Sequence, residues 1–561
     1  MPTMAFSWFD YTFFCGMLGL SVIIGIYFGF FDKQDTTEEY LLGGKSMKIL
    51  PVAMSLVASH ISGITILAVP ADVYRFGSNY WWICISIPLV CLITSYIFLP
   101  VYFKLEFTSV YEYLNIRFDK KIRTLASFLF TLSVFFYNPV VVYIPALAFS
   151  QATGINVHLI TPVVCVICIF YTTIGGLKAV VWTDALQFVG IIGSSIAVFF
   201  VGASAAGGFS VVWEKAVQGH RLDLFNLNFD PTIRDDFWAM VIGATFQWLF
   251  YIALNQGSVQ KFLAVPTLQH ARKAIIIYIL GMITLKSLSV FTGDIMYAKY
   301  SNCDPLTSKQ ISRSDQLLPF FVIDVAGKIP GLPGLFIAGV FSAALSTLSA
   351  TLNTVAGTIY KDFISPFMPA NTTEKRASNI LKLLVIISGT ICTVLVFIVE
   401  KMGGMLPFVT ALQGIAGGPL VGLFSLGVLF PQANSKGALY GGIIALIFVA
   451  WKEFGSQWYQ SQGLIKGPIK PLSVENCVNY LNISVIQDDL ALEEPFVLYR
   501  ISFWYNTLIG AVIVIIIGLI ISWFTNKNQP PVNPDLISPV MHFMLPKSSV
   551  SSTKDYLSVD H

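Results

Sequence analysis

Charged residues are scarce in this chain of 561 residues: only 12% are Asp, Glu, Lys or Arg, and the net charge is +3. A typical soluble domain has about 25% charged residues. Together with a hydrophobic content of 55%, this scarcity excludes a disordered chain and an ordinary soluble enzyme. The small net charge gives no basis for a nucleic-acid partner. A mean hydropathy of +0.71 indicates that the chain is solvated by a lipid bilayer.

Motifs of metal and redox enzymes are also scarce. HExxH is absent and the six histidines are scattered along the chain, so a membrane-embedded enzyme is poorly supported. Cys165 and Cys168 stand inside an apolar run and are interpreted as packing residues rather than metal ligands. The sequence therefore predicts no catalytic residues and no enzyme activity.

Long apolar runs, in contrast, recur along the whole chain. A spanning helix needs about 20 mostly apolar residues, and this criterion predicts about thirteen spans. They lie at 8–31, 50–70, 79–103, 122–150, 157–177, 183–205, 237–257, 274–298, 332–360, 378–400, 405–430, 436–453 and 500–524. We expect an all-α polytopic membrane protein whose transmembrane domain covers 8–524. Residues 1–7 form a short outside segment, and the Pro- and Ser-containing tail 525–561 is expected to be disordered.

The loops between these runs differ in charge. Loops that follow odd-numbered runs carry most of the Lys and Arg residues, among them Lys33, Lys120 and Lys121. The two long loops of the other set, 206–236 and 454–499, are acidic or mixed. Because cytoplasmic loops of membrane proteins are rich in Lys and Arg, we expect the N-terminus outside and the C-terminus, with its tail, in the cytosol.

Two features of the predicted loops bear on this topology. Asn482 begins an Asn-Ile-Ser sequence in an outside loop and is expected to be glycosylated, whereas Asn371 begins Asn-Thr-Thr on the inside and is not. Cys303 and Cys477 are the only cysteines in the outside loops, where oxidising conditions permit a disulfide. Two free thiols are the alternative.

Polar residues interrupt the second apolar run. Its middle contains Ser55, Ser59, His60, Ser62 and Thr65. Irregular backbone at membrane depth is tolerated only where it lines protein or water, and an intramembrane ionisable residue usually marks a functional site. The pattern predicts a broken helix at a binding site. Helix packing through small residues is the alternative.

The ninth run is rich in hydroxyl side chains. Ser342, Ser346, Ser349 and Asn353 recur at i+3 and i+4 and therefore share one helix face. Hydroxyl oxygens are hard, neutral ligands that suit a small alkali cation, whereas a soft metal prefers Cys or His. A packing seam of small residues is again the alternative.

The seventh run stands five runs after the second and is likewise interrupted, by Gln247, Trp248, Asn255 and Gln256. Discontinuous helices in matching positions of two halves indicate an inverted-repeat transporter. We therefore expect two inverted five-helix repeats, at about 50–205 and 237–430.

Segments along the chain resemble the sodium/solute symporter family. They are PADVYRFGSNYW (70–81), YTTIGGLKAVVWTDALQ (171–187), NQGSVQKFLA (255–264), CDPL (303–306) with DQLLPFFV (315–322), and GLPGLFIAGVFSAALSTLSATLN (331–353). The resemblance covers about 8–525 and is strongest to the branch of iodide, monocarboxylate and multivitamin carriers. It implies a LeuT-like core with one peripheral helix before it and two after it.

The resemblance also implies a sodium site between the second and ninth spans. The backbone carbonyls and side-chain hydroxyls that match its ligands belong to Ala58, Ile61, Ala343, Ser346 and Thr347. Asp184 matches a carboxylate on the inward sodium path. The alternative for Asp184 is a structural partner for nearby backbone or for Lys178.

A substrate pocket is implied near the break in the second span. The matching candidates are His60, Ser62, Thr65, Tyr143, Trp248 and Thr410. His60 departs from the aromatic or small polar residue of related carriers, and Thr65 is like the monocarboxylate branch. Thr410 is also the one hydroxyl that could complete a second sodium site on the eleventh span.

The sequence thus predicts a multi-pass, plasma-membrane symporter in which Na+ is the co-transported ion. Its substrate is expected to be a small organic anion, first of all a monocarboxylate, moved by alternating access. A vitamin (biotin or pantothenate) or iodide symporter is the alternative within transport. An uncoupled sensor or channel on the same scaffold is the alternative from another class.

Overall fold

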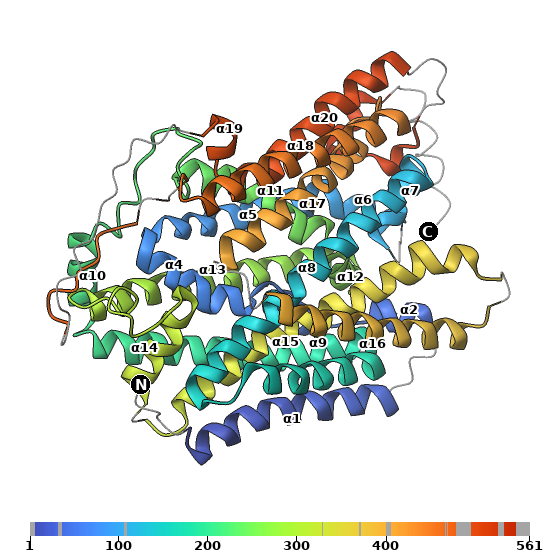
Figure 1. Ribbon diagram of the computed structural model, residues 1–561. Coiled ribbons are helices and arrows are strands. Elements are labelled where there is room, and N and C mark those ends of the chain that lie inside the picture. The colour runs from blue at the N-terminus through green and yellow to red at the C-terminus, as the bar shows by residue number, and fades with distance from the viewer. Residues whose placement is uncertain are drawn as a thin grey trace.

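The computed structural model describes residues 6–31, 36–105, 109–327, 329–369, 372–399, 405–465, 467, 469–477, 495–525 and 532–545. All regular structure within these residues is helical (Figure 1). Asn371 and Asn482 lie outside the described residues.

The helices follow one another with short connections. They are α1 (Trp8–Phe30), α2 (Thr37–Leu42), α3 (Ile49–His60), α4 (Val69–Phe76), α5 (Ile83–Ile93), α6 (Leu99–Leu105), α7 (Val110–Arg117), α8 (Lys120–Thr153), α9 (Val157–Ala205), α10 (Phe209–Gln218), α11 (Ala244–Leu249), α12 (Gln256–Leu263), α13 (Leu268–Tyr300), α14 (Leu317–Ala326), α15 (Leu332–Thr358), α16 (Glu374–Val399), α17 (Met405–Leu429), α18 (Ser435–Ser461), α19 (Val497–Arg500) and α20 (Asn506–Thr525).

Ten helices within the described residues are long and apolar enough to cross a membrane, or up to eleven when the bent pair Ile49–His60 and Ile64–Phe76 is counted as one span. A shorter apolar helix covers Ala239–Leu254. The 49 residues of α9 would be roughly 70 Å long, more than twice the hydrocarbon thickness of a bilayer. Gly176 interrupts α9 with φ 52° and ψ −154°, so α9 combines two of the predicted runs. The all-α multi-span class is confirmed, while the count of about thirteen and the orientation stay predictions.

The hydroxyl-rich helix α15 lies in the centre of the bundle. In the apolar window of its span, 89% of the residues are buried inside the protein, against 17% in α1. Figure 1 shows α1 on one margin of the molecule and α18 with α20 on the opposite margin. The bilayer solvates the exposed apolar side chains of α1, whereas α15 must satisfy its hydroxyls within the protein.

Loops of the two predicted sets gather at opposite ends of the helices. In Figure 1, α10, α14 and α19 lie at one end, and α2 and α7 lie at the other. The first group comes from loops that the charge pattern assigns to the outside, and the second from loops assigned to the inside.

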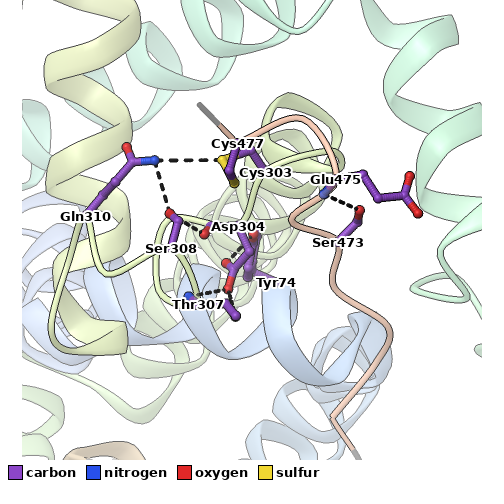
Figure 2. Close-up of a disulfide and its surroundings, with 9 residues drawn as sticks. All are labelled: Tyr74, Cys303, Asp304, Thr307, Ser308, Gln310, Ser473, Glu475 and Cys477. Atoms are coloured by element: carbon purple, nitrogen blue, oxygen red, sulfur yellow. Dashed lines mark hydrogen bonds between the residues drawn. A yellow bond between two sulfur atoms is a disulfide. The ribbon is translucent and has the colours of Figure 1, made fainter. Parts of the chain in front are cut away.

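A disulfide joins Cys303, after α13, to Cys477, in the loop after α18, with Cα atoms 5.1 Å apart (Figure 2). The neighbouring Asp304 donates its backbone N–H to the carbonyl of Ser473 at 2.9 Å. Its carboxylate accepts a hydrogen bond of 2.7 Å from the hydroxyl of Tyr74, on α4. These contacts fasten the loop after α18 to the outer half of the bent pair.

Part of the C-terminal tail is ordered. Residues Pro534–Leu536 (η11) and Pro539–Met544 (η12) form 3-10 turns, between which Ile537 is 1% exposed. Ser538 donates its N–H to the carbonyl of Val428 at 3.0 Å. The disorder predicted for 525–561 is therefore wrong over 532–545, because apolar side chains among the prolines find a place to be buried.

Candidate functional site

The second span is broken where its polar residues predict. Helix α3 ends at His60, Ile61 has an extended backbone (φ −97°, ψ 94°), and the chain resumes as a π-helical turn, η2 (Ile64–Ala68). The two halves are bent by 59°. Gly63 has helical φ and ψ, but a Cβ there would meet Pro145 Cγ at 2.8 Å. Glycine is thus required for close approach to α8 and not for backbone freedom.

The seventh span contains a matching interruption. It begins as η5 (Ala239–Gly243) and α11, and its π-helical turn η6 (Phe250–Leu254) ends at Asn255, which has an extended backbone (φ −69°, ψ 123°). The Asn255 side chain then accepts a hydrogen bond from Gly257 N at 2.8 Å, which starts α12. The two interruptions lie in the two halves of the chain, as an inverted repeat requires.

His60 links these two interruptions. Its Nδ1 lies 2.7 Å from the carbonyl oxygen of Leu56, and its Nε2 lies 3.2 Å from both the carbonyl oxygen of Tyr251 and the hydroxyl of Ser258. A neutral imidazole satisfies this set by donating from Nδ1 to Leu56 and accepting at Nε2 from Ser258. Both ring nitrogens are therefore engaged by protein groups.

A cavity of about 1060 Å³, including its open mouth, lies between the two interruptions. Five of the six predicted substrate residues line it: His60, Ser62, Thr65, Trp248 and Thr410. Tyr143 does not line the cavity, and its hydroxyl accepts a hydrogen bond of 3.0 Å from Arg313. Tyr137, nearly two turns earlier on α8, lines the cavity instead. The predicted role of Tyr143 in the pocket is not supported by this arrangement.

Lys286 is a cavity residue that the sequence reasoning missed. It comes from α13, is 1% exposed, and donates to the hydroxyls of Thr65 at 3.2 Å and Tyr80 at 2.9 Å. Its ammonium also lies 5.0 Å from the ring centroid of Trp248. Among the described residues no carboxylate forms an ion pair with Lys286. The signal in the sequence was the single charge between Lys273 and Asp294 in an apolar helix.

The predicted sodium residues lie beside the same break. Thr347 Oγ1 donates to the carbonyl oxygens of Ala343, at 3.0 Å, and of Ser59, at 3.1 Å. Ser346 Oγ lies 3.4 Å from Ser59 Oγ. Ala58 is in the last turn of α3, and Ile61 is the residue with extended backbone that follows it. Hydroxyls of α15 and backbone oxygens near the break therefore come from facing elements.

Asp184 has a buried partner that the sequence did not indicate. Its Oδ2 accepts from Lys261 Nζ at 2.9 Å, from Ser55 Oγ at 2.7 Å and from Ser59 Oγ at 3.1 Å. The alternative partner considered from the sequence was Lys178; the pair forms with Lys261, on α12. Lys261 also lines the cavity. The carboxylate thus lies one side chain, Ser59, away from the predicted sodium hydroxyls.

Comparisons with known proteins agree on the family. The profile of the "Sodium:solute symporter family" matches residues 40–445. A "Sodium-coupled monocarboxylate transporter 2" from Mus musculus is 38% identical and covers 99% of this chain and 90% of its own length. A "Sodium-coupled monocarboxylate transporter 1" from Homo sapiens is 35% identical, with 94% and 89% covered. A "Putative sodium-dependent multivitamin transporter" from Drosophila melanogaster is 36% identical, with 92% and 86% covered.

A solved structure shows the same fold. The substrate-bound, outward-open state of a Na+-coupled sialic acid symporter superposes with a TM-score of 0.76 at 22% identity. The match covers 94% of this chain and 99% of that protein. At this identity the likeness supports the arrangement of helices and not the choice of substrate.

Proposed function

Because the chain belongs to the sodium:solute symporter family, we propose that it carries a small monocarboxylate into the cell together with sodium ions. Membership of this family makes it a multi-pass membrane transporter and not an enzyme, with Na+ as the co-transported ion. Such a transporter is consistent with the plasma membrane. The substrate and the residues that contact it are our proposal.

The observation that carries the choice of an anion is Lys286. Burying an ammonium is costly unless an opposite charge compensates it, and in the described part of the chain its hydrogen-bond partners are the neutral hydroxyls of Thr65 and Tyr80. A substrate carboxylate in the cavity would supply that charge. Charge-assisted hydrogen bonds are about twice as strong as neutral ones, so Lys286 would select a carboxylate over a neutral analogue of the same shape.

Aromatic side chains give the cavity an apolar side as well. Trp248 and Tyr251 are 5.5 Å apart between ring centroids and both line the cavity, and Tyr137 lines it from α8. A carboxylate at Lys286 would place its apolar part against these rings. This arrangement fits short aliphatic and aromatic monocarboxylates, whose charge is confined to one end.

Sodium would bind between the break and α15. Ser346 and Thr347 would supply hydroxyl oxygens, and Ala58, Ile61 and Ala343 would supply carbonyl oxygens, because hard neutral oxygens suit Na+. This site would adjoin the cavity, since Thr347 lines it. Sodium at this position would hold the two halves of the broken span against α15 and so favour substrate binding by the same conformation.

A vitamin carrier is the second candidate, and the likeness to the insect multivitamin transporter favours it. Biotin and pantothenate each carry one carboxylate, so Lys286 would serve them in the same way. They differ from lactate in the volume that the cavity must accept. The choice between the two candidates therefore depends on the size of the preferred monocarboxylate.

The proposal is tested by uptake into proteoliposomes that contain the purified protein, with an inward sodium gradient or the same concentration of choline. The labelled panel is lactate, nicotinate, biotin, pantothenate, iodide and myo-inositol, with nicotinamide as the neutral partner of nicotinate. We expect sodium-dependent uptake of a monocarboxylate and none of nicotinamide. Uptake of iodide or myo-inositol without any carboxylate would contradict the proposal.

Accumulation at steady state gives the stoichiometry in the same vesicles. With a tenfold sodium gradient and about 60 mV, one sodium ion per monoanion supports about tenfold accumulation, because the transported charges cancel. Two sodium ions support roughly a thousandfold, because the net charge adds the membrane potential.

A further inference from the structure

Lys261 is a buried cation beside the proposed sodium site. Its side chain is 2% exposed, and its Nζ lies 2.9 Å from Asp184 Oδ2, 2.5 Å from Ser59 Oγ and 3.2 Å from the carbonyl oxygen of Ser55. An ammonium has three N–H donors, and these three acceptors engage all of them. The charge is therefore held at one place by two elements, α3 and α9.

Ser59 connects this ammonium to the proposed sodium ligands. Its hydroxyl contacts both Lys261 Nζ and, at 3.4 Å, Ser346 Oγ, while its carbonyl oxygen accepts from Thr347. The ammonium is accordingly within about 6 Å of the Ser346 hydroxyl. Two unit charges at such a separation repel each other strongly where water is excluded.

Asp184 supplies the negative charge for both cations. Its Oδ2 accepts three hydrogen bonds, whereas its Oδ1 is buried and has no hydrogen-bond partner within the described residues. A buried carboxylate oxygen without a partner is costly, so this atom retains the capacity to attract a cation. One carboxylate thus lies beside a fixed ammonium and close to the path of a mobile ion.

We propose that Lys261 is a tethered competitor of the transported sodium ion: its ammonium and the ion share Ser59 and the charge of Asp184. The ammonium lowers the affinity of the adjoining site and compensates Asp184 when sodium departs, so that release does not leave an isolated buried charge. Lys261 acts on sodium through Ser59 and Asp184 and is therefore a positioning residue. The inference rests on the sodium site of the proposed function.

The alternative is an ion pair that only stabilises the fold, and the chain provides a matched control for it. Lys452, on α18, is also 2% exposed in its side chain and lies 3.7 Å from Glu453 Oε2. It donates to Asn506 at 2.7 Å, and neither Lys452 nor Glu453 lines the cavity. Lys452→Met removes a buried, paired ammonium of the same kind at a place without sodium.

The test measures the sodium concentration for half-maximal uptake in Lys261→Met, Lys261→Arg and Lys452→Met. It also measures, without substrate, the sodium concentration that raises the melting temperature of the purified protein by half its maximal shift. We expect Lys261→Met to lower both concentrations by about tenfold, the change that corresponds to about 1.4 kcal/mol. Maximal uptake should fall, because sodium leaves more slowly. Lys261→Arg and Lys452→Met should titrate like the wild type.

Removal of one partner can prevent folding, so a second comparison is included. Asp184→Asn leaves Lys261 uncompensated and should raise the half-saturating sodium concentration. Adding Lys261→Met to Asp184→Asn should lower it again several-fold, because the competing charge is gone. A pair that only stabilises the fold would restore expression in the double variant without changing the sodium titration.

The outcomes separate this inference from the proposed function. Unchanged sodium titrations in Lys261→Met and in the double variant, beside a raised concentration in Ser346→Ala, would overturn the competitor role alone. Unchanged titrations in Ser346→Ala and Thr347→Ala would overturn the sodium site itself, whatever Lys261→Met does.

Discussion

The ammonium of Lys286 lies 3.2 Å from the hydroxyl of Thr65, although 221 positions separate these residues in the chain. The contact joins α13 to the π-helical turn that follows the break in the second span. It places the charge of one helix beside the irregular backbone of another, in the cavity between the two repeats. Substrate recognition and the break in the span therefore depend on one small group of side chains.

Lys286→Met is expected to raise the half-saturating concentration of the preferred monocarboxylate by about tenfold or more, since a hydrogen bond to a charged group contributes about 1.5–3 kcal/mol. The measurement is concentration-dependent uptake at saturating sodium. Lys286→Arg keeps the charge and should retain part of the affinity. Equal affinity for nicotinate in the Met variant and the wild type would remove Lys286 from the substrate site.

Ser346→Ala and Thr347→Ala should each raise the sodium concentration for half-maximal uptake several-fold, or abolish uptake with surface expression preserved. Each substitution removes one oxygen ligand from an ion that needs several. Ser342→Ala is the matched control, because its hydroxyl bonds the Ala338 carbonyl within the same helix at 2.7 Å. The sodium assignment fails if all three variants titrate alike.

His60→Phe separates two roles of the histidine. If the ring shapes the cavity, the variant should change the order of preference among the labelled monocarboxylates. If it only connects Leu56 and Ser258, expression should fall while the order of preference stays the same. The panel of uptake rates, normalised to surface protein, decides between them, and a uniform loss for every substrate would assign His60 to packing.

Cys303→Ser and Cys477→Ser should lower surface expression by similar amounts, and the double variant should add little, because either change breaks the same bond. Cys84→Ser, at a buried free thiol, is the control for loss of a cysteine. Additive losses, or labelling of both thiols in the untreated wild type, would show that the bridge is not formed in the cell.

Asn482 should carry a glycan and Asn371 should not, since the charge bias places them on opposite sides of the membrane. The mobility of the protein on a gel, before and after glycosidase, measures this directly. Asn482→Gln should abolish the shift and Asn371→Gln should leave it intact. A shift that persists in Asn482→Gln would contradict the predicted topology.

The sequence by itself determined the membrane class, the interrupted second span and the hydroxyl-rich ninth span. Hydropathy and polar interruptions are local properties, because partition into a bilayer depends on each segment of about 20 residues. The cysteines of the outside loops could be paired from topology alone, since the remaining cysteines lie in apolar runs.

Only the tertiary structure decided which helix faces meet. Lys261 and Asp184 are 77 positions apart, and nothing in either segment indicates that one compensates the other. The same holds for Tyr143, which bonds Arg313 while Tyr137 lines the cavity, and for Ile537, which is buried in a tail whose composition predicts disorder. These outcomes depend on packing between distant segments, where the low dielectric makes each buried charge and hydroxyl find a partner or a ligand.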